Sequence, residues 1–204
     1  MTAPHKPAST SAPIHHIISH RWSPRAFDSR PVEPEKLRSL LEAARWAASA
    51  YNAQPWSFIV ATKDDPENFQ RVLECFVEFN QSWARHAPVV ALTAAFLKFP
   101  HNGQPNRYAF HDVGQAAANL ALQAAEFGLQ IHQMAGIDPE KARKTFGVPP
   151  DYEVVSGIAL GYPGDPAALP DQLRERELAA RERKPLAAFV YAGQWGNPSP
   201  LVKP

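Results

Sequence analysis

Three short apolar runs, separated by segments with helical periodicity, constrain the fold of this chain most strongly. The runs are Trp56 to Thr62, Pro88 to Phe96 and Tyr152 to Leu160. They are rich in β-branched or aromatic residues, which is typical of strands that are buried in a sheet. Because helical segments lie between them, the sequence predicts an α/β or α+β protein.

The helical segments have apolar residues spaced three or four positions apart. The longest predicted helix runs from Tyr108 to Phe127 and is followed by Gly128, a residue type that commonly ends a helix. Its many alanines would let a neighbouring element approach closely. Shorter helices are expected at Ile14 to His20, Pro34 to Ala47, Pro66 to Phe79, Asp138 to Phe146 and Asp171 to Glu182.

Size and charge exclude several classes of protein. The 204 residues fit one domain, and 45% apolar content is enough for a sizeable core. A formal net charge of +1 gives no reason to expect nucleic acid or an anionic membrane as a partner. No apolar run approaches the roughly 20 residues that a membrane span needs, and the N-terminus lacks the apolar core of a signal peptide.

The single cysteine, Cys75, cannot form a disulfide within the chain, which suits a reducing cytoplasm. We expect Cys75 to be buried and inert, because no basic neighbour stands at a reactive spacing. His15, His16 and His20 suggest a metal at first sight. No acidic residue accompanies them, so we interpret them as a solvated helix face and expect no metal site.

We expect three parts along the chain. Residues 1–13 contain Pro, Ala, Ser and Thr with little to bury, which predicts a disordered or weakly attached tail. Residues 14–195 would form a single domain, and residues 196–204 a C-terminal tail.

A polar stretch, Ala48 to Trp56, joins a predicted helix to a predicted strand. Its sequence is Ala-Ser-Ala-Tyr-Asn-Ala-Gln-Pro-Trp. Short polar side chains at such a junction lie where α/β and α+β proteins usually hold a ligand. The final proline and tryptophan fix the turn and anchor it in the core. On its own, the stretch fits equally well a polar loop with a packed tryptophan.

Two other segments carry arginines that can bind an anion. Arg21 and Arg25 stand four positions apart, within Arg21-Trp22-Ser23-Pro24-Arg25-Ala26-Phe27. Near the other end of the chain, Arg181-Glu182-Arg183-Lys184 precedes Pro185-Leu186. The planar guanidinium group suits phosphate because it donates paired hydrogen bonds. The alternative is that all four arginines are simply solvated.

These segments together resemble the motifs of the nitroreductase family, FMN-dependent NAD(P)H oxidoreductases. The first is similar to the family's Pro-Ser-Ala-x-Asn-x-Gln-Pro-Trp, and the second to its Arg-x-Ser-x-Arg-x-Phe. The family's Asp-x-Gly-x-Ala-x-x-Asn-Leu helix and its basic segment before Pro-Leu also have counterparts, in the same order and with similar spacing. The third match is carried by Asp112, Gly114, Ala116, Asn119 and Leu120.

The resemblance implies a cofactor site for FMN. Arg21 and Ser23, with Trp22 between them and Arg183 and Arg181 from the C-terminal segment, would hold the phosphate and ribityl chain. Arg25 would lie near the pyrimidine edge of the flavin ring and stabilise its reduced form. The remaining implied contacts come from two loops, with Ser49, Ala50, Asn52 and Gln54 in one and Gln133, Met134, Ala135 and Gly136 in the other.

Two positions depart from the family pattern. Ala48 stands where proline is usual, which removes some turn rigidity but no side-chain ligand. Ala135 stands where the family often has an acidic residue. The resemblance places a backbone N–H of this loop near flavin N5, and a backbone donor does not need that side chain.

The implied fold is α+β, with a small mixed or antiparallel sheet, surrounding helices, one long central helix and an intertwined homodimer. The implied function is hydride transfer from NAD(P)H to flavin N5 and then to a small-molecule acceptor such as a nitroaromatic or quinone, by a ping-pong mechanism in the cytoplasm. A flavin-binding carrier or flavin-processing protein without NAD(P)H turnover is the first alternative. A helical interaction protein without any cofactor is the second.

Overall fold

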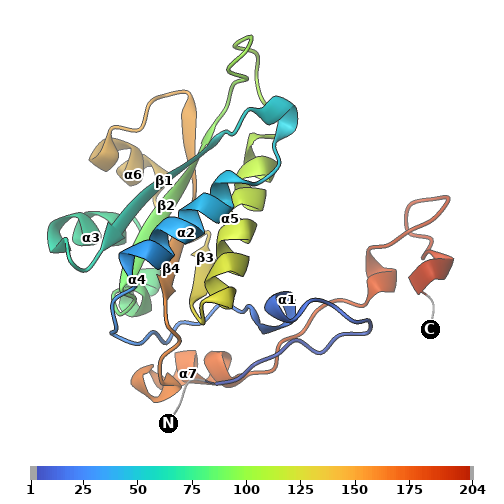
Figure 1. Ribbon diagram of the computed structural model, residues 1–204, viewed down its shortest axis with the longest axis horizontal. Coiled ribbons are helices and arrows are strands. Elements are labelled where there is room, and N and C mark those ends of the chain that lie inside the picture. Colours follow the sequence, from blue (N-terminus) through green and yellow to red (C-terminus); the bar gives the residue numbers. More distant parts are fainter. Residues whose placement is uncertain (1–3, 203–204) are drawn as a thin grey trace.

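A computed structural model describes residues 4–202 and shows one antiparallel sheet with helices on both faces (Figure 1). Within these residues the sheet has four strands in the order β1-β2-β4-β3. The strands are β1 (Trp56–Thr62), β2 (Val89–Phe96), β3 (Gln130–Met134) and β4 (Tyr152–Gly161). The predicted α+β class is confirmed, and the three predicted strands match β1, β2 and β4 to within one residue at each end.

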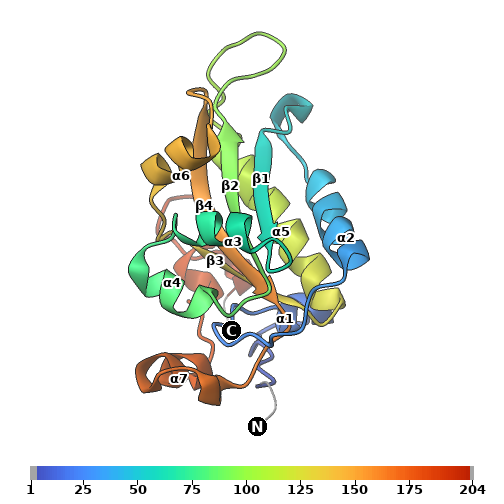
Figure 2. The same ribbon diagram turned by 90° about the vertical axis from the view of Figure 1, so that its left-hand side faces the viewer.

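The sheet is covered by α2 and α5 on one face and by α3, α4 and α6 on the other (Figure 2). The long helix α5 lies against the centre of the sheet, as predicted. The α-helices of the described chain are α1 (His16–His20), α2 (Pro34–Arg45), α3 (Pro66–Leu73), α4 (Glu78–Ala84), α5 (Ala109–Glu126), α6 (Pro139–Phe146) and α7 (Asp171–Leu178). Four short 3-10 turns are η1 (Ala50–Asn52), η2 (Pro166–Ala168), η3 (Leu186–Ala188) and η4 (Pro200–Val202).

Strand β2 shows why the core has two halves. Successive strand side chains point to opposite faces. Val89 and Ala91 therefore pack under α2 and α5, whereas Val90 and Leu92 pack under α3 and α4. Because both faces are covered, β2 is almost wholly apolar.

Local sequence signals set several helix ends. Asp138 accepts a hydrogen bond from Lys141 N (2.9 Å) at the start of α6, and Gly147 ends that helix with a φ of 62°. Asp65 caps α3 in the same way through Asn68 N (3.1 Å). Both pairs are side-chain caps that satisfy a free backbone N–H of the first turn.

The helix predicted at Pro66 to Phe79 is wrong in its length, because the chain divides there into α3 and α4. Between them, Phe76 forms a bridge with Ile137, and the Cys75 carbonyl accepts a hydrogen bond from Asp138 N (2.7 Å). These tertiary bonds replace helical ones. Cys75 is buried, as predicted, and burial raises the pKa of its thiol.

Strand β3 is absent from the sequence prediction, which places Gln133 to Gly136 in a loop. It pairs with β4 from Gln130, opposite Gly161, to Met134, opposite Gly157. Its side chains include Gln130 and His132, so it lacks the apolar character of the other strands. It lies at one edge of the sheet.

The two chain ends run beside each other below the sheet (Figure 1). Arg181 donates hydrogen bonds to the carbonyls of Lys6 (2.7 Å) and Ser19 (2.8 Å). The segment after Pro185 then leaves the body of the chain as an arm. Residues 1–3 and 203–204 of the predicted tails lie outside the described residues.

None of the helices in residues 4–202 is long and apolar enough to cross a membrane. The same residues contain no cluster of three His, Cys, Asp or Glu side chains that is able to hold a metal ion.

Candidate functional site

A cationic cavity of about 200 Å³ lies between α7, the segment after α1 and the N-terminal segment. Six cationic side chains and one carboxylate line it. Sequence positions more than 150 residues apart meet here, as the hydrogen bonds of Arg181 show. The lining residues are Lys6, Arg21, Trp22, Ser23, Arg25, Arg176, Glu177, Ala179, Ala180, Arg181 and Arg183.

Edge strand β3 holds the arginine-bearing segment in place. Gln130 Oε1 accepts a hydrogen bond from Trp22 N (2.9 Å), and Gln130 Nε2 donates to His20 O (3.3 Å). Two residues further along the strand, on the same face, His132 Nδ1 lies 2.9 Å from Pro24 O. The polar side chains of β3 therefore fix residues 20–24 along the strand, which positions Arg21 at the cavity.

Glu177 is a buried carboxylate at the floor of the cavity. It is 1% exposed and accepts hydrogen bonds from Arg25 N (2.9 Å) and Ala26 N (3.0 Å). Burial raises the pKa of this carboxyl, although the two backbone donors oppose the shift. The side chain ties α7 to the segment after α1, because one carboxylate satisfies two backbone N–H groups from that segment.

The arginines of the cavity are close enough to affect one another. Burial lowers the pKa of Arg21, and the charges of Arg181 and Arg183 lower it further. Burial also lowers the pKa of Arg181, and Arg183 adds to the effect. Mutual repulsion of this kind is relieved when an anion binds among the guanidinium groups.

Arg25 has an unused donor. Its Nε is buried and has no hydrogen-bond partner among the described residues. The guanidinium lies over the ring of Trp83 at 5.9 Å, and His132 packs against the same ring with centroids 4.6 Å apart. A buried unpaired donor beside other cations points to an anionic or oxygen-rich ligand.

The polar junction stretch, residues 48–56, contains η1 and has an unusual backbone. Tyr51, Asn52 and Gln54 have φ values of 52°, 53° and 46°. Positive φ is rare for residues other than glycine, although asparagine tolerates it better than most. Such conformations cluster at ligand sites, where the surrounding structure holds them in place.

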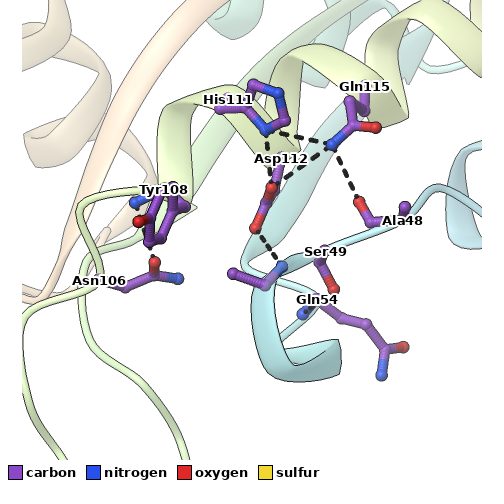
Figure 3. A network of polar contacts seen from close by, with 9 residues as sticks. Ala48, Ser49, Gln54, Asn106, Tyr108, His111, Asp112 and Gln115 are labelled. Carbon is purple, nitrogen blue, oxygen red and sulfur yellow. Dashed lines mark hydrogen bonds and ion pairs between the residues drawn. The ribbon is translucent and has the colours of Figure 1, made fainter.

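Asp112 of α5 is the main support of this stretch (Figure 3). Its buried carboxylate accepts a hydrogen bond from Ala50 N (3.0 Å) and lies 3.0 Å from His111 Nδ1. Within the stretch, Ser49 Oγ accepts from Gln54 N (3.1 Å). The side chains of Asn52 and Gln54 remain exposed.

We predict that Asp112→Ala destabilises the protein by about 1–3 kcal/mol, the cost of leaving a partly buried donor unpaired. Ala50 N–H would lose its acceptor, and Asp112→Asn retains an acceptor oxygen at that position. Urea unfolding of the two variants measures the difference. Equal stability of Asp112→Ala and wild type would contradict the assigned role.

Residues 133–136 comprise the last two residues of β3 and the two residues that follow it. Gly136 O accepts hydrogen bonds from Val77 N (3.0 Å) and Asn80 Nδ2 (2.9 Å) at the start of α4. A Cβ at Gly136 would lie 2.4 Å from Asn80 Nδ2 and 2.9 Å from Val77 Cγ2, so any larger residue would force these side chains to move. The backbone here is therefore held in one place.

The cavity and residues 48–56 lie at opposite ends of the folded structure in space. In both ribbon views α7 is at the bottom and the cyan turn near residue 50 is at the top (Figures 1 and 2). Tyr51 packs there against Phe99 and His101, with ring centroids 5.6 and 5.5 Å apart. One chain therefore does not bring the two groups of predicted ligand residues together.

A sequence model of the nitroreductase family matches residues 18–162, which is more than half of the chain. This chain belongs to the nitroreductase family. The matched region contains residues 21–25, 48–56 and 133–136, and the basic segment with Arg181 and Arg183 follows it.

Two relatives and one solved structure show what this chain is similar to. An "NADH dehydrogenase" of Thermus thermophilus is 31% identical over 71% of this chain and 84% of its own length. An uncharacterized 15.4 kDa protein of Mycolicibacterium smegmatis is 41% identical over 45% of this chain, and the match spans 62% of that protein. A crystal structure described as an oxidoreductase containing FMN has 36% identity and a TM-score of 0.88, with 97% of this chain and all of that chain covered.

The structure brings together one group of the residues that the resemblance implied. Arg21, Ser23, Arg25, Arg181 and Arg183 all line the cavity, together with Trp22. Residues 133–136 lie beyond the part of β3 that holds residues 20–24. The other group lies far from the cavity in space and consists of Ser49, Ala50, Asn52 and Gln54.

Sequence reasoning missed Lys6, Arg176 and Glu177 in the cavity. Arg176 and Glu177 belong to a helix in which most residues are charged, so nothing in the sequence separates the buried carboxylate from its solvated neighbours. Lys6 lies in a segment interpreted as a tail. Gln130 and His132 had a usable signal, since polar residues alternate there with Ile131 in the manner of a half-buried strand.

The cavity fits the phosphate end of FMN and not the whole molecule. The cationic side chains and the Ser23 hydroxyl suit a phosphate dianion and its attached polyol. Pockets that enclose a cofactor-sized ligand usually span about 300–1,000 Å³. A cavity of about 200 Å³ therefore leaves the ring system of such a ligand outside it.

We predict that acid destabilises this protein through His132. Burial lowers the pKa of His132 to about 4, and the Arg25 charge adds to the shift. An unfolded histidine has a pKa near 6.5, so the unfolded chain binds more protons between these values and folding stability is lost as the pH falls. The loss between pH 7.5 and pH 5 amounts to about 2 kcal/mol.

Urea unfolding of wild type and His132→Asn at both pH values tests this assignment. Asparagine keeps a donor near Pro24 O but does not titrate in this range. Between pH 7.5 and pH 5, the free energy of unfolding of the variant should fall by about 2 kcal/mol less than that of wild type. Parallel pH dependence in the two proteins would show that another group is responsible.

Proposed function

We propose that this nitroreductase is an FMN-dependent oxidoreductase that takes reducing equivalents from NADH or NADPH and passes them to a small electron acceptor. The cationic cavity is the observation that carries the proposal. It brings the five residues predicted for the phosphate end, together with Arg25, into one site from both ends of the chain. The fold neighbour described as containing FMN, at a TM-score of 0.88, supports the same cofactor.

The phosphate would lie among Arg21, Arg181 and Arg183, where it relieves their mutual repulsion. Ser23 adds a hydroxyl donor at the same place. The guanidinium of Arg25 would face the flavin ring, where a fixed positive charge stabilises negative charge on the reduced ring. Its position is set by Trp83 and by the anchoring of its backbone N–H to Glu177.

We propose that the site is completed by a second copy of the chain, so that Ser49, Ala50, Asn52 and Gln54 of one copy face the cavity of the other. Three observations support this arrangement. The two groups of residues are far apart in one chain, the cavity is too small for the whole cofactor, and the C-terminal arm exposes large aromatic side chains. Phe189 is 57% exposed and Trp195 92% exposed.

FMN, when bound, would accept two electrons as hydride from the nicotinamide and donate them to an acceptor such as a nitroaromatic or a quinone. The chain itself binds and orients. The arginines fix the phosphate end, residues 133–136 offer rigid backbone, and residues 49–54 cover the ring from the second copy. If nicotinamide and acceptor occupy the same face in turn, the kinetics are ping-pong.

Purification without added flavin, followed by a visible spectrum and chromatography of the released cofactor, tests the proposal. Bound FMN that is bleached by NADH or NADPH without oxygen, and parallel double-reciprocal plots with a quinone acceptor, are the expected results. FMN that neither nucleotide reduces would favour a flavin carrier. A colourless protein that does not take up added FMN would exclude both flavin functions.

A further inference from the structure

The N-terminal segment, residues 4–13, contacts the cavity although it precedes the part of the chain that matches the family, residues 18–162. It contains no helix or strand. It is nevertheless attached at two points, since Lys6 O accepts from Arg181 Nη1 (2.7 Å) and Ala8 N donates to Ser19 O (2.8 Å). The first contact ties it to the C-terminal segment and the second ties it to α1.

The ammonium group of Lys6 lies at the cavity. It donates a hydrogen bond to Glu177 O and lies 5.1 Å from the centroid of the Trp22 ring. An ammonium has three donors, so this bond leaves two for a ligand. Lys6 lines the cavity together with Arg21, Arg181 and Arg183, the three arginines of the proposed phosphate site.

The backbone of Lys6 is coupled to the same site. Arg181 is one of the proposed phosphate ligands, and its Nη1 donates to both Lys6 O and Ser19 O. The N-terminal segment thus orients an arginine through its carbonyl group and adds a cation through its side chain. An ion that binds here contacts groups from three separate segments of the chain.

We propose that Lys6 is a further phosphate-binding residue and that residues 4–13 act as a clasp that slows the release of FMN. This inference rests on the proposed function and concerns the phosphate monoester end of the cofactor. A clasp over the phosphate strengthens binding of FMN, which carries the dianion, and leaves binding of riboflavin unchanged, since riboflavin lacks the phosphate.

Lys6→Met tests the assignment, because methionine keeps an unbranched side chain that still packs on Trp22 but carries no charge. We expect FMN affinity to fall about tenfold, the size of one lost hydrogen bond to a charged group. FMN should leave the diluted holoprotein correspondingly faster, as recovered flavin fluorescence reports. Riboflavin affinity should stay as in wild type.

Two further variants complete the experiment. Lys6→Arg keeps the charge and should retain most of the FMN affinity, whereas Lys144→Met on α6, outside the cavity, should behave as wild type. If Lys6→Met binds FMN as wild type does, or loses affinity for riboflavin as much as for FMN, the proposed role of Lys6 and residues 4–13 is wrong, while the proposed function still stands. If wild type binds neither flavin, the proposed function fails and the clasp fails with it.

Discussion

Arg21→Met should lower the affinity for FMN by about 100-fold and leave the affinity for riboflavin almost unchanged. Arg21 lines the cationic cavity, where burial lowers its pKa and the charges of Arg181 and Arg183 lower it further. A guanidinium that donates two hydrogen bonds to a phosphate dianion contributes about 1.5–3 kcal/mol, which corresponds to a loss of roughly 10- to 150-fold. Partial burial favours the upper part of this range.

Flavin fluorescence titration of the flavin-free protein measures both affinities. Arg38→Met is a matched control, because Arg38 is an exposed arginine of α2 that does not line the cavity. It should bind FMN as wild type does. If Arg21→Met binds FMN normally, or loses riboflavin to the same extent, the phosphate does not lie in this cavity.

The double variant Phe189→Asp, Trp195→Asp should be monomeric and free of FMN. Both side chains belong to the arm that leaves the body of the chain, where the tilted rings of Trp195 and Tyr191 pack against each other with centroids 5.1 Å apart. Burying one large aromatic side chain stabilises an interface by about 2–3 kcal/mol. In a symmetric dimer the change occurs twice, so the dissociation constant should rise by several orders of magnitude.

Light scattering and the bound flavin content measure the two effects. Thermal unfolding provides the control, since neither side chain belongs to the core of the single chain and each copy should remain folded. A double variant that is still dimeric would show that the arm does not form the interface. A wild-type monomer that holds FMN would contradict the shared site itself.

The sequence predicted those elements whose local residue pattern agrees with the surroundings in which they are packed. Strand β1 has the predicted bounds because Trp56 to Thr62 pair fully with β2. Its alternate residues Phe58 and Val60 pack under α2 and α5, whereas Ile59 and Ala61 pack on the other face. Helix α5 was predicted because its apolar spacing and Gly128 agree. In both, the local pattern and the tertiary surroundings favour the same structure.

Prediction failed where tertiary contacts replaced local ones. Around Cys75 the helical pattern continues, but Phe76 bridges to Ile137 and the helix ends at Leu73. In β3 the polar residues Gln130 and His132 have partners more than 100 positions away, in residues 20–24. Such partners cannot be found from spacing along the chain.

The arginines of the site were predicted through the family motifs, whereas Glu177 and Lys6 were not. Glu177 is the buried member of an otherwise solvated charged helix, and only its bonds to Arg25 N and Ala26 N distinguish it. Lys6 reaches the cavity because the N-terminal segment binds Arg181. Both roles depend on the two ends of the chain meeting in space.

Co-purification of mixed dimers tests most directly whether two copies build one flavin site. One copy would carry Arg21→Met and the other Asn52→Ala with Gln54→Ala, each with a different affinity tag. A dimer of either variant alone has two defective sites. The mixed dimer has one site in which an intact cavity faces an intact residue 48–56 stretch, and one site with both defects.

We predict that mixed dimers, isolated through both tags, contain about one FMN per dimer, whereas each variant alone retains little. NADH or NADPH should bleach that flavin. Mixed dimers with no more FMN than the two variants alone would show that the cavity and residues 48–56 of different copies do not share a cofactor, and would contradict the proposed site.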